Sequence, residues 1–179
     1  AAQNRENLRR ITDALVMANI KADATTKQLA QTLIRQAGPA MRLFGKDIEE
    51  ALAMAMTMAD QGDKGVTAGT HMSMALRHLS MKAIEKPEGF KAMGIDVFDK
   101  NRNLKHMADI ADDLYKVLTP YSDEARAKIF KSMGFEAKLQ QSLFSLLGKA
   151  KQFREFDKIL REQAPGSRES VMKKQMEAF

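Results

Sequence analysis

The sequence of 179 residues contains no cysteine and no tryptophan. Without cysteine, the chain can form no disulfide, no thiolate metal site and no cysteine nucleophile. No apolar run approaches the roughly 18 residues of a membrane-spanning helix, and no signal peptide is recognised at the start. Because the first residue is Ala1 rather than methionine, we expect a processed chain or a part of a longer protein.

The sequence also lacks a block of charge of one sign. The net charge is +6, and residues 1–60, 61–148 and 149–179 contribute +1, +2 and +3 to it. A dedicated nucleic-acid-binding protein is expected to concentrate its lysines and arginines. The even distribution therefore argues against that class, although the excess favours acidic surroundings over basic ones.

Methionine is abundant, with thirteen residues. Its unbranched side chain fills irregular gaps in a core and, at a surface, supports promiscuous binding. We interpret most of these residues as core filler.

Apolar residues recur at helical spacing over most of the chain, which predicts an all-α fold. We expect a compact array or bundle of helices with one short β-hairpin near residues 95–105. The helix over 4–20 has a single apolar stripe, which suits a coiled-coil seam or a helix lying on a core. A second helix, capped by Thr25 and Thr26, is expected to stop at Gly38-Pro39, because glycine suits the left-handed position after a helix and proline cannot continue it.

The third helix is predicted to be the central one. Asp47 and Glu50 have the spacing of a capping box, and the residues from Ile48 to Gln61 are apolar on nearly all sides, which is typical of a buried helix. Further helices are expected over 40–44, 68–83 after an N-cap at Thr67, 88–93, 107–118, 123–133 after an N-cap at Ser122, 136–164 as one long or slightly broken helix with a kink at Gly148, and a last polar helix capped by Ser167.

The stretch from Gly62 to Leu79 organises this interpretation. Gly62 and Gly65 suit a tight turn before a helix, and the small residues Ala68 and Gly69 would let another backbone come close. Glycine-rich turns before helices also bind phosphates. Here neither phosphate-binding glycine motif is present and the preceding segment is helical, so a structural turn is favoured.

No pattern identifies a metal site, a cofactor or a catalytic centre. Asp99, Asn101 and Asn103 match the first ligands of an EF-hand loop, but the glycine and the final glutamate of that loop are missing. His71 and His78 would lie about 10 Å apart along one helix, too far to share a metal ion, and His106 stands alone.

Two further groups have a functional and a structural interpretation. Asp109, Asp112 and Asp113 could do acid–base chemistry, but carboxylates in the first half of a helix are stabilised by its dipole, which we favour. Phe153 and Phe156, beside lysines and arginines, could stack on bases, but packing against another helix is favoured. We expect no enzyme and no cofactor.

Several segments, in order, resemble the core region of phage tail tape-measure proteins. They are Thr26-Lys27-Gln28-Leu29 through Ala37-Gly38-Pro39, Asp47 to Ala53 with Met58-Ala59, Gly62-x-Lys64-Gly65-x-x-Ala68-Gly69-Thr70 with Met74 and His78-Leu79, Met93-Gly94-Ile95-Asp96-Val97-Phe98-Asp99 with Asn103-Leu104, and Ile129-Phe130 with Gly134 and Ala137. The resemblance spans roughly residues 24–147. It departs from the family at Arg102, where a glycine is usual, and at Met133-Gly134, where Phe-Gly is usual.

The resemblance implies a structural role. Tape-measure proteins occupy the lumen of the growing tail, set its length as a ruler, and leave ahead of the DNA. The resemblance also implies a set of structural signature residues: Gly38, Pro39, Gly62, Gly65, Ala68, Gly69, Thr70, Gly94, Phe98 and Asp99. We expect an N-terminal amphipathic helix over 1–22, the tape-measure core helical domain over 23–150 and a C-terminal helical extension over 151–179.

The chain has too many glycines and prolines to be the long ruler helix, so we interpret it as a compact domain of a larger tape measure. Expected partners are tail tube, tail-tip or baseplate hub proteins, tail assembly chaperones, copies of itself, and DNA without sequence specificity. It is expected in the tail lumen of the virion and in the host cytoplasm during assembly. The alternatives are a basic helical nucleic-acid-binding module and, less favoured, a peptidoglycan-cleaving domain.

Overall fold

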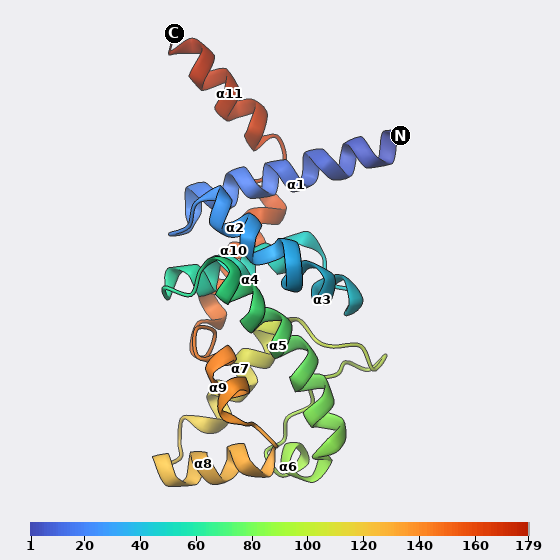
Figure 1. The fold of residues 1–179 in the computed structure, drawn as a ribbon, viewed down its shortest axis with the longest axis vertical. Coiled ribbons are helices and arrows are strands. Elements are labelled where there is room, and N and C mark those ends of the chain that lie inside the picture. Colours follow the sequence, from blue (N-terminus) through green and yellow to red (C-terminus); the bar gives the residue numbers. More distant parts are fainter. Residues whose placement is uncertain (179) are drawn as a thin grey trace.

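The structure, a computed structural model, describes residues 1–178 and confirms the all-α fold (Figure 1). Within these residues the predicted hairpin contains no strand and one antiparallel bridge, between Phe98 and Leu104. The helices are α1 (Ala2–Lys21), α2 (Thr26–Thr32), the π-helix η1 (Leu33–Ala37), α3 (Gly38–Leu43), α4 (Ile48–Asp60), α5 (Gly65–Glu85), α6 (Pro87–Ala92), α7 (Met107–Leu118), α8 (Asp123–Ser132), α9 (Ala137–Leu143), α10 (Ala150–Glu162) and α11 (Ser167–Glu177).

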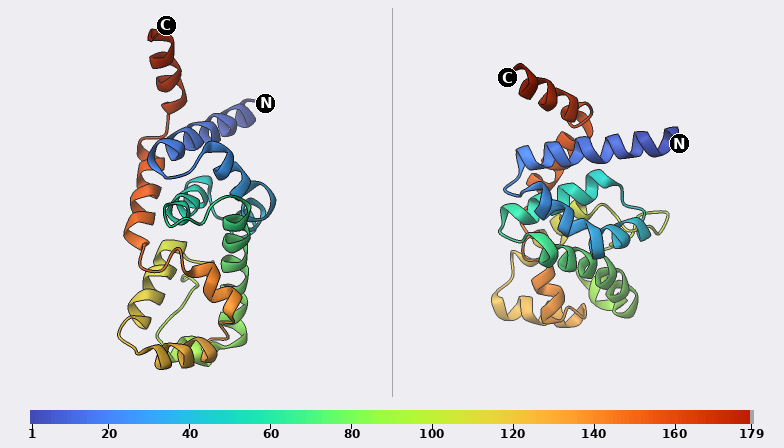
Figure 2. Two further views of the ribbon diagram at one scale, coloured as in Figure 1. Left: turned by 60° about the vertical axis from the view of Figure 1, so that its left-hand side comes forward. Right: turned by 45° about the horizontal axis from the view of Figure 1, so that its top comes forward.

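The helices form an elongated body around α4 (Figures 1 and 2). Helix α10 packs along α4, and α5 packs against α2, η1 and α9. Helices α6 and α8 lie at one end of the body, while α1 and α11 lie at the other. The N-terminal half of α1 and most of α11 extend beyond the body. No helix within residues 1–178 is sufficiently long and apolar to span a membrane.

Helix α4 is the central helix, as predicted. Its residues from Ala51 to Ala59 are all buried, and a fully buried side chain such as Met54 contributes about 1.5–3 kcal/mol relative to an exposed one. Asp47 caps the helix by accepting a hydrogen bond from the Glu50 N–H at 3.0 Å. The reciprocal half of the predicted capping box is not formed, because the Glu50 carboxylate instead accepts the Met107 N–H.

The prediction that Gly38-Pro39 ends the second helix is wrong. The chain continues through the π-helix η1 into α3, and Gly38 has a helical φ of −58°. The wide π turn brings the Leu33 carbonyl oxygen to the place where a Cβ of residue 38 would stand. Glycine is needed there for space, and Pro39 is tolerated in the first turn of α3 because its missing N–H costs nothing at that position.

Two predicted helix starts are displaced. Helix α5 begins at Gly65 with Lys64 as N-cap, so Thr67 lies inside its first turn. Helix α11 begins at Ser167 and has Gly166, with φ +82°, as N-cap. In both cases a glycine with positive φ, Gly65 or Gly166, lies at or next to the helix start. The predicted capping residues, Thr67 and Ser167, come after it in the chain. Thr25 and Ser122 do cap α2 and α8 as predicted.

The single helix predicted over 136–164 is two helices, α9 and α10, separated by a turn. Gly148 does not kink a helix but adopts φ +79°, and a Cβ there would lie 3.1 Å from the Tyr115 ring. The turn sends α10 along α4 and α7, where Phe153 and Phe156 are buried. The packing interpretation of these two phenylalanines is therefore confirmed.

The core is rich in methionine, as expected. The fully buried methionines are Met41, Met54, Met56, Met58, Met72, Met107 and Met133, all at most 2% exposed. Met172 and Met176 are exposed on α11, at 52% and 74%. Met81 of α5 is also 52% exposed. The core-filler interpretation is thus confirmed for most of the methionines but not for these three.

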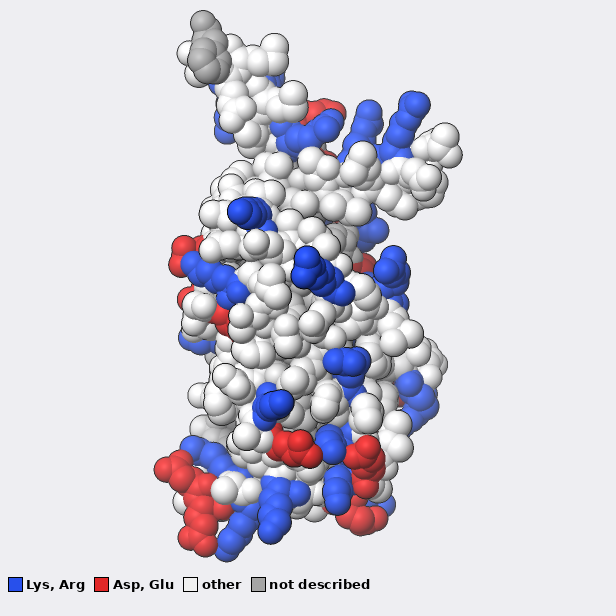
Figure 3. Space-filling model, in the orientation of Figure 1, with Lys and Arg blue, Asp and Glu red and all other residues white. Residues whose placement is uncertain are grey.

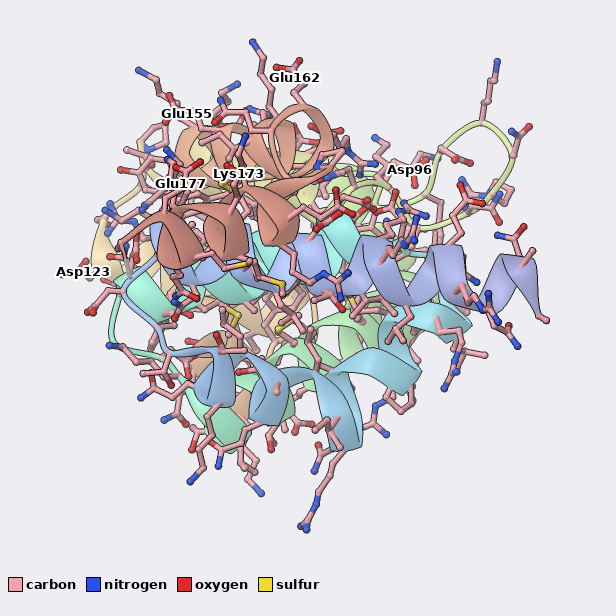
Figure 4. All side chains as sticks on the ribbon, turned by 90° about the horizontal axis from the view of Figure 1, so that it is seen from above. Asp96, Asp123, Glu155, Glu162, Lys173 and Glu177 are labelled. Atoms are coloured by element: carbon pink, nitrogen blue, oxygen red, sulfur yellow. The ribbon has the colours of Figure 1, made fainter. Side chains whose placement is uncertain are left out.

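Helix α1 lies on the body with only part of its apolar stripe. Ala14 and Ala18 are buried, whereas Leu8 and Ile11 are 65% and 40% exposed. The start of α11 contacts α1, and in the view from above α11 lies in front of α1 (Figure 4). Both oxygens of the Asp13 carboxylate hold the start of α11, accepting the N–H groups of Gly166 at 3.0 Å and of Arg168 at 3.1 Å.

Candidate docking surfaces

The glycine signature lies where α5 crosses α2. The Thr32 hydroxyl donates a hydrogen bond to the Gly65 carbonyl at 2.9 Å. Gly69 lies against the Thr32 main chain, so closely that a Cβ would overlap the carbonyl oxygen, and Ala68 is fully buried. The expected close approach of another backbone is confirmed. Thr70 only donates to the Val66 carbonyl of its own helix.

The hairpin segment is ordered by its own side chains. The Asp99 carboxylate accepts the N–H groups of Asn101 at 2.8 Å and of Asn103 at 3.0 Å, and Gly94 at its base has φ +67°. Both bonds go to the same carboxylate oxygen, Oδ1. Within residues 1–178 no group of three potential metal ligands is found.

Arg102 takes the left-handed conformation that glycine usually supplies, with φ +62°. Its guanidinium lies over the Phe98 ring, 4.9 Å from the centroid, and 3.1 Å from the Asp96 carboxylate. The N–H of Phe98, followed by the Arg102 charge, outweighs burial and lowers the pKa of Asp96 below its usual value.

Two hollows of about 570 Å³ each flank this hairpin. Phe98 and Arg102 line both of them. The first hollow is largely apolar and lies between α5, α6 and the hairpin, with Phe90 and Val97 in its lining. The second is more polar and is shared with the loop between α3 and α4. The hairpin thus separates an apolar cleft from a polar one.

A buried ionic cluster fixes the hairpin to the core. The Lys46 ammonium donates to the main-chain carbonyls of Leu104 at 2.9 Å and Lys105 at 2.6 Å, and it lies 3.2 Å from the Glu50 carboxylate. Glu50 also accepts the Met107 N–H at 3.2 Å. Burying Lys46 and Glu50 is acceptable because each charge has several partners.

His106 belongs to the same cluster. Its Nδ1 caps α7 by accepting the Ala108 N–H at 3.1 Å, which places the proton of the neutral ring on Nε2. Nε2 is buried without a hydrogen-bond partner, 3.7 Å from Glu50 and 3.6 Å from Asp157. The ring also packs against Phe153, with centroids 5.2 Å apart.

Arg161 extends the cluster to α10. Its guanidinium donates to Asp47 at 2.7 Å and to Asp157 at 3.0 Å, and these hydrogen bonds raise the pKa of Arg161 further above its usual value. Burial acts to raise the pKa of Asp47, but the hydrogen bonds from Arg161 and from the Glu50 N–H outweigh it, so the pKa of Asp47 is lowered. The cluster joins α4, α7 and α10.

Sequence patterns gave no signal for this cluster, because its members are far apart in the chain.

Sequence patterns also gave no signal for a basic surface, because the charge is even along the sequence. The fold nevertheless gathers cations on the outer side of α2, η1 and α3, and residues 24–46 contain no Asp or Glu. The exposed residues Lys27, Ile34, Arg35, Arg42 and Leu43 define what we call the basic face.

Lys and Arg predominate over α2 and α3 in the view of Figure 3, whereas most of the visible Asp and Glu lie at the left edge and the lower end. Some cations on other helices are paired with acids: Lys116, for example, lies 2.8 Å from Asp112, and this hydrogen bond lowers the pKa of Asp112.

A comparison with protein families finds that the model described as "Phage-related minor tail protein" matches residues 1–134. Neither the curated proteins nor the solved structures contain a match.

Proposed function

Because the chain belongs to the family of phage-related minor tail proteins and is thus a structural phage tail protein, we propose that it is a compact domain of a tape-measure protein. In this role it does not span the tail as the ruler helix does. It docks the ruler onto other tail proteins during assembly and leaves the tail when the DNA is ejected.

The observation that carries this proposal is the position of the signature residues. Gly65, Ala68 and Gly69 form the contact between α5 and α2, and Gly94, Phe98 and Asp99 shape the hairpin. The residues behind the tape-measure resemblance are therefore those that this fold needs for close packing and tight turns. The family match over residues 1–134 includes all of them.

The proposed docking elements are the helix faces and the hairpin. The hairpin is anchored at its base by Lys46 and flanked by the two hollows, so it presents a fixed shape to a partner. We propose tail tube proteins, tail-tip or hub proteins, assembly chaperones or further copies of this chain as partners. The proposed locations are the tail lumen in the virion and the host cytoplasm during assembly.

We propose a non-enzymatic role. A peptidoglycan-cleaving domain would need a poised carboxylic acid. The buried glutamates Glu49 and Glu50 serve the fold instead, since Glu49 binds Arg10 and Glu50 binds Lys46 and the Met107 N–H. Incubation with purified cell walls should release no soluble fragments.

A second candidate function is non-specific contact with nucleic acid, which the net charge of +6 favours. Such binding would weaken steeply with salt, because it would rest on the release of counterions from phosphates. A gel shift of duplex DNA at 50 mM and 200 mM salt tests it.

Virions from which DNA has been ejected in vitro provide the test of the tape-measure role. A tape-measure domain should resist protease in intact virions, because the tube encloses it, and should be absent from tails after ejection. Immunoblotting against this chain, with the tail tube protein as a retained control, measures both. A chain that remains in emptied tails, or that protease removes from intact virions, would show that it is a different minor tail protein.

A further inference from the structure

The basic face is a continuous strip on one side of α2, η1 and α3. Its inner side is buried, with Leu29, Ala37 and Met41 in the core. The opposite side exposes Lys27, Arg35 and Arg42. Arg35 and Arg42 are seven positions apart, so they share one helix face.

The cations of the basic face are unpaired. Among residues 1–178, none of Lys27, Arg35 and Arg42 forms an ion pair with an acidic side chain. By contrast, Arg154 binds Asp109 and Arg126 binds Asp123 on other helices. The charges of Lys27, Arg35 and Arg42 are therefore available to an anionic partner, and no ion pair within the protein has to break.

The cations of the basic face repeat with the period of a helix. Arg35 and Arg42 are seven residues apart, about two turns or 10 Å. Lys27 and Arg35 are eight apart, but the π-helix η1 takes one more residue per turn, so this step also spans about two turns. Carboxylates placed every seventh residue on a neighbouring helix repeat at about the same distance.

Large apolar side chains lie within the basic face. Ile34 is 70% exposed and Leu43 is 77% exposed. A DNA backbone offers phosphates to the arginines but no apolar surface to these two residues. A protein partner buries both kinds of side chain, and arginine is enriched at such interfaces.

We propose that the basic face binds an acidic amphipathic helix of a partner protein, whose apolar stripe covers Ile34 and Leu43 and whose flanking carboxylates pair with Arg35 and Arg42. This inference rests on the docking role proposed above and names the chemistry of the partner. It does not depend on whether the whole protein is a ruler.

The test uses the purified chain and fluorescently labelled synthetic helices. The probe is a 21-residue peptide of three heptads, with leucine at the two core positions, glutamate at the flanking ones and alanine elsewhere. A peptide of the same composition, with the leucines moved so that they form no stripe, is the matched peptide control. A 20-base-pair DNA duplex is the third probe, and anisotropy measures binding.

Three variants assign any binding to the face. Arg35→Glu/Arg42→Glu reverses its charge, and Ile34→Ser/Leu43→Ser removes its apolar part. Lys151→Glu/Lys158→Glu makes the same change of charge on exposed positions of α10. All are surface changes, and circular dichroism confirms folding.

We expect the striped acidic peptide to bind at least about tenfold more tightly than its rearranged control. Both basic-face variants should weaken binding of the striped peptide about tenfold, and the α10 variant should leave this binding unchanged. Tighter binding of the duplex, insensitive to Ile34→Ser/Leu43→Ser, would overturn the proposal in favour of a nucleic acid. Absence of peptide binding would overturn it too. Neither result changes where the chain is found after DNA ejection. The tape-measure role is therefore tested independently, by the immunoblot of emptied tails.

Discussion

Gly69 of α5 lies directly against the main-chain carbonyl of Thr32, the last residue of α2. No other residue type fits this crossing, because a Cβ would overlap the carbonyl oxygen. The contact is reinforced by the hydrogen bond from the Thr32 hydroxyl to Gly65.

Replacing Gly69 by alanine should therefore force α2 and α5 apart. We expect the free energy of unfolding to fall by about 3 kcal/mol, the upper part of the usual range for overpacking. The control is Gly62→Ala, since Gly62 has φ +87° but open space around it, so only about 1 kcal/mol of backbone strain is expected there. Urea unfolding measures both, and equal losses would contradict the close approach.

Asp13 of α1 acts as a cap for α11, although the two helices are far apart in sequence. Its replacement by alanine removes both side-chain acceptors of the Gly166 and Arg168 N–H groups. We expect trypsin to cleave faster after Arg168, Lys173 and Lys174, while the main unfolding transition hardly changes. Asp13→Asn keeps one acceptor oxygen and should be cleaved at an intermediate rate. Cleavage of the alanine variant at the wild-type rate would contradict the clamp.

The pairing of Asp47 with Arg161 makes stability depend on pH. Because the pKa of Asp47 is lowered in the folded state, its contribution is present above the unfolded pKa of about 3.9 and is lost as the pH falls through the folded value. Arg161→Gln should reduce the loss of stability between about pH 5 and pH 2. Urea unfolding at several pH values measures this, with Arg42→Gln as the unpaired control. An unchanged slope in Arg161→Gln would show that the pair has no such effect.

His106 combines a helix cap with core packing. His106→Ala removes the acceptor for the Ala108 N–H and the ring that packs on Phe153. We expect a loss of about 2 kcal/mol in the free energy of unfolding. His106→Asn retains an acceptor at the cap and should lose clearly less. If asparagine is no better than alanine, the cap contributes nothing and only the ring matters.

Arg102 occupies a left-handed position in the hairpin. Arg102→Gly relieves about 1 kcal/mol of backbone strain but loses the exposed contacts to Asp96 and Phe98, so its net effect on stability should be near zero. Arg102→Val loses the same contacts and places a branched side chain in this conformation, which is strongly disfavoured. Thermal unfolding of the two variants should therefore separate them, with valine the less stable.

The parts of the fold that follow from local rules were predictable. The caps at Thr25, Asp47 and Ser122 form between residues near one another in the chain. The burial of α4 and the close approach at Gly69 were indicated by local composition, although their packing partners, such as Thr32, are distant in the chain. The errors have both local and distant causes. Gly38-Pro39 suggests a stop, but a π turn carries the helix through it, and the turn at Gly148 is shaped by its packing on Tyr115.

The candidate surfaces were less predictable than the helices. His106 meets Glu50 and Asp157 only because α4, α7 and α10 pack together, and no spacing in the sequence announces that. The basic face arises because residues without acids share one side of the body, which an even distribution of charge along the chain conceals. Both features depend on the tertiary arrangement.

The clamp at Asp13 also has a mechanical consequence. Helix α11 is about 16 Å long. Its start is attached to Asp13 of α1 by two hydrogen bonds to the carboxylate and by one from the Ser167 hydroxyl to the main-chain carbonyl. A rotation of about 10° about this attachment point would move the far end of α11 by about 3 Å. Because most of α11 extends beyond the body (Figure 1), a force on its far end would act as a torque on α1 at Asp13.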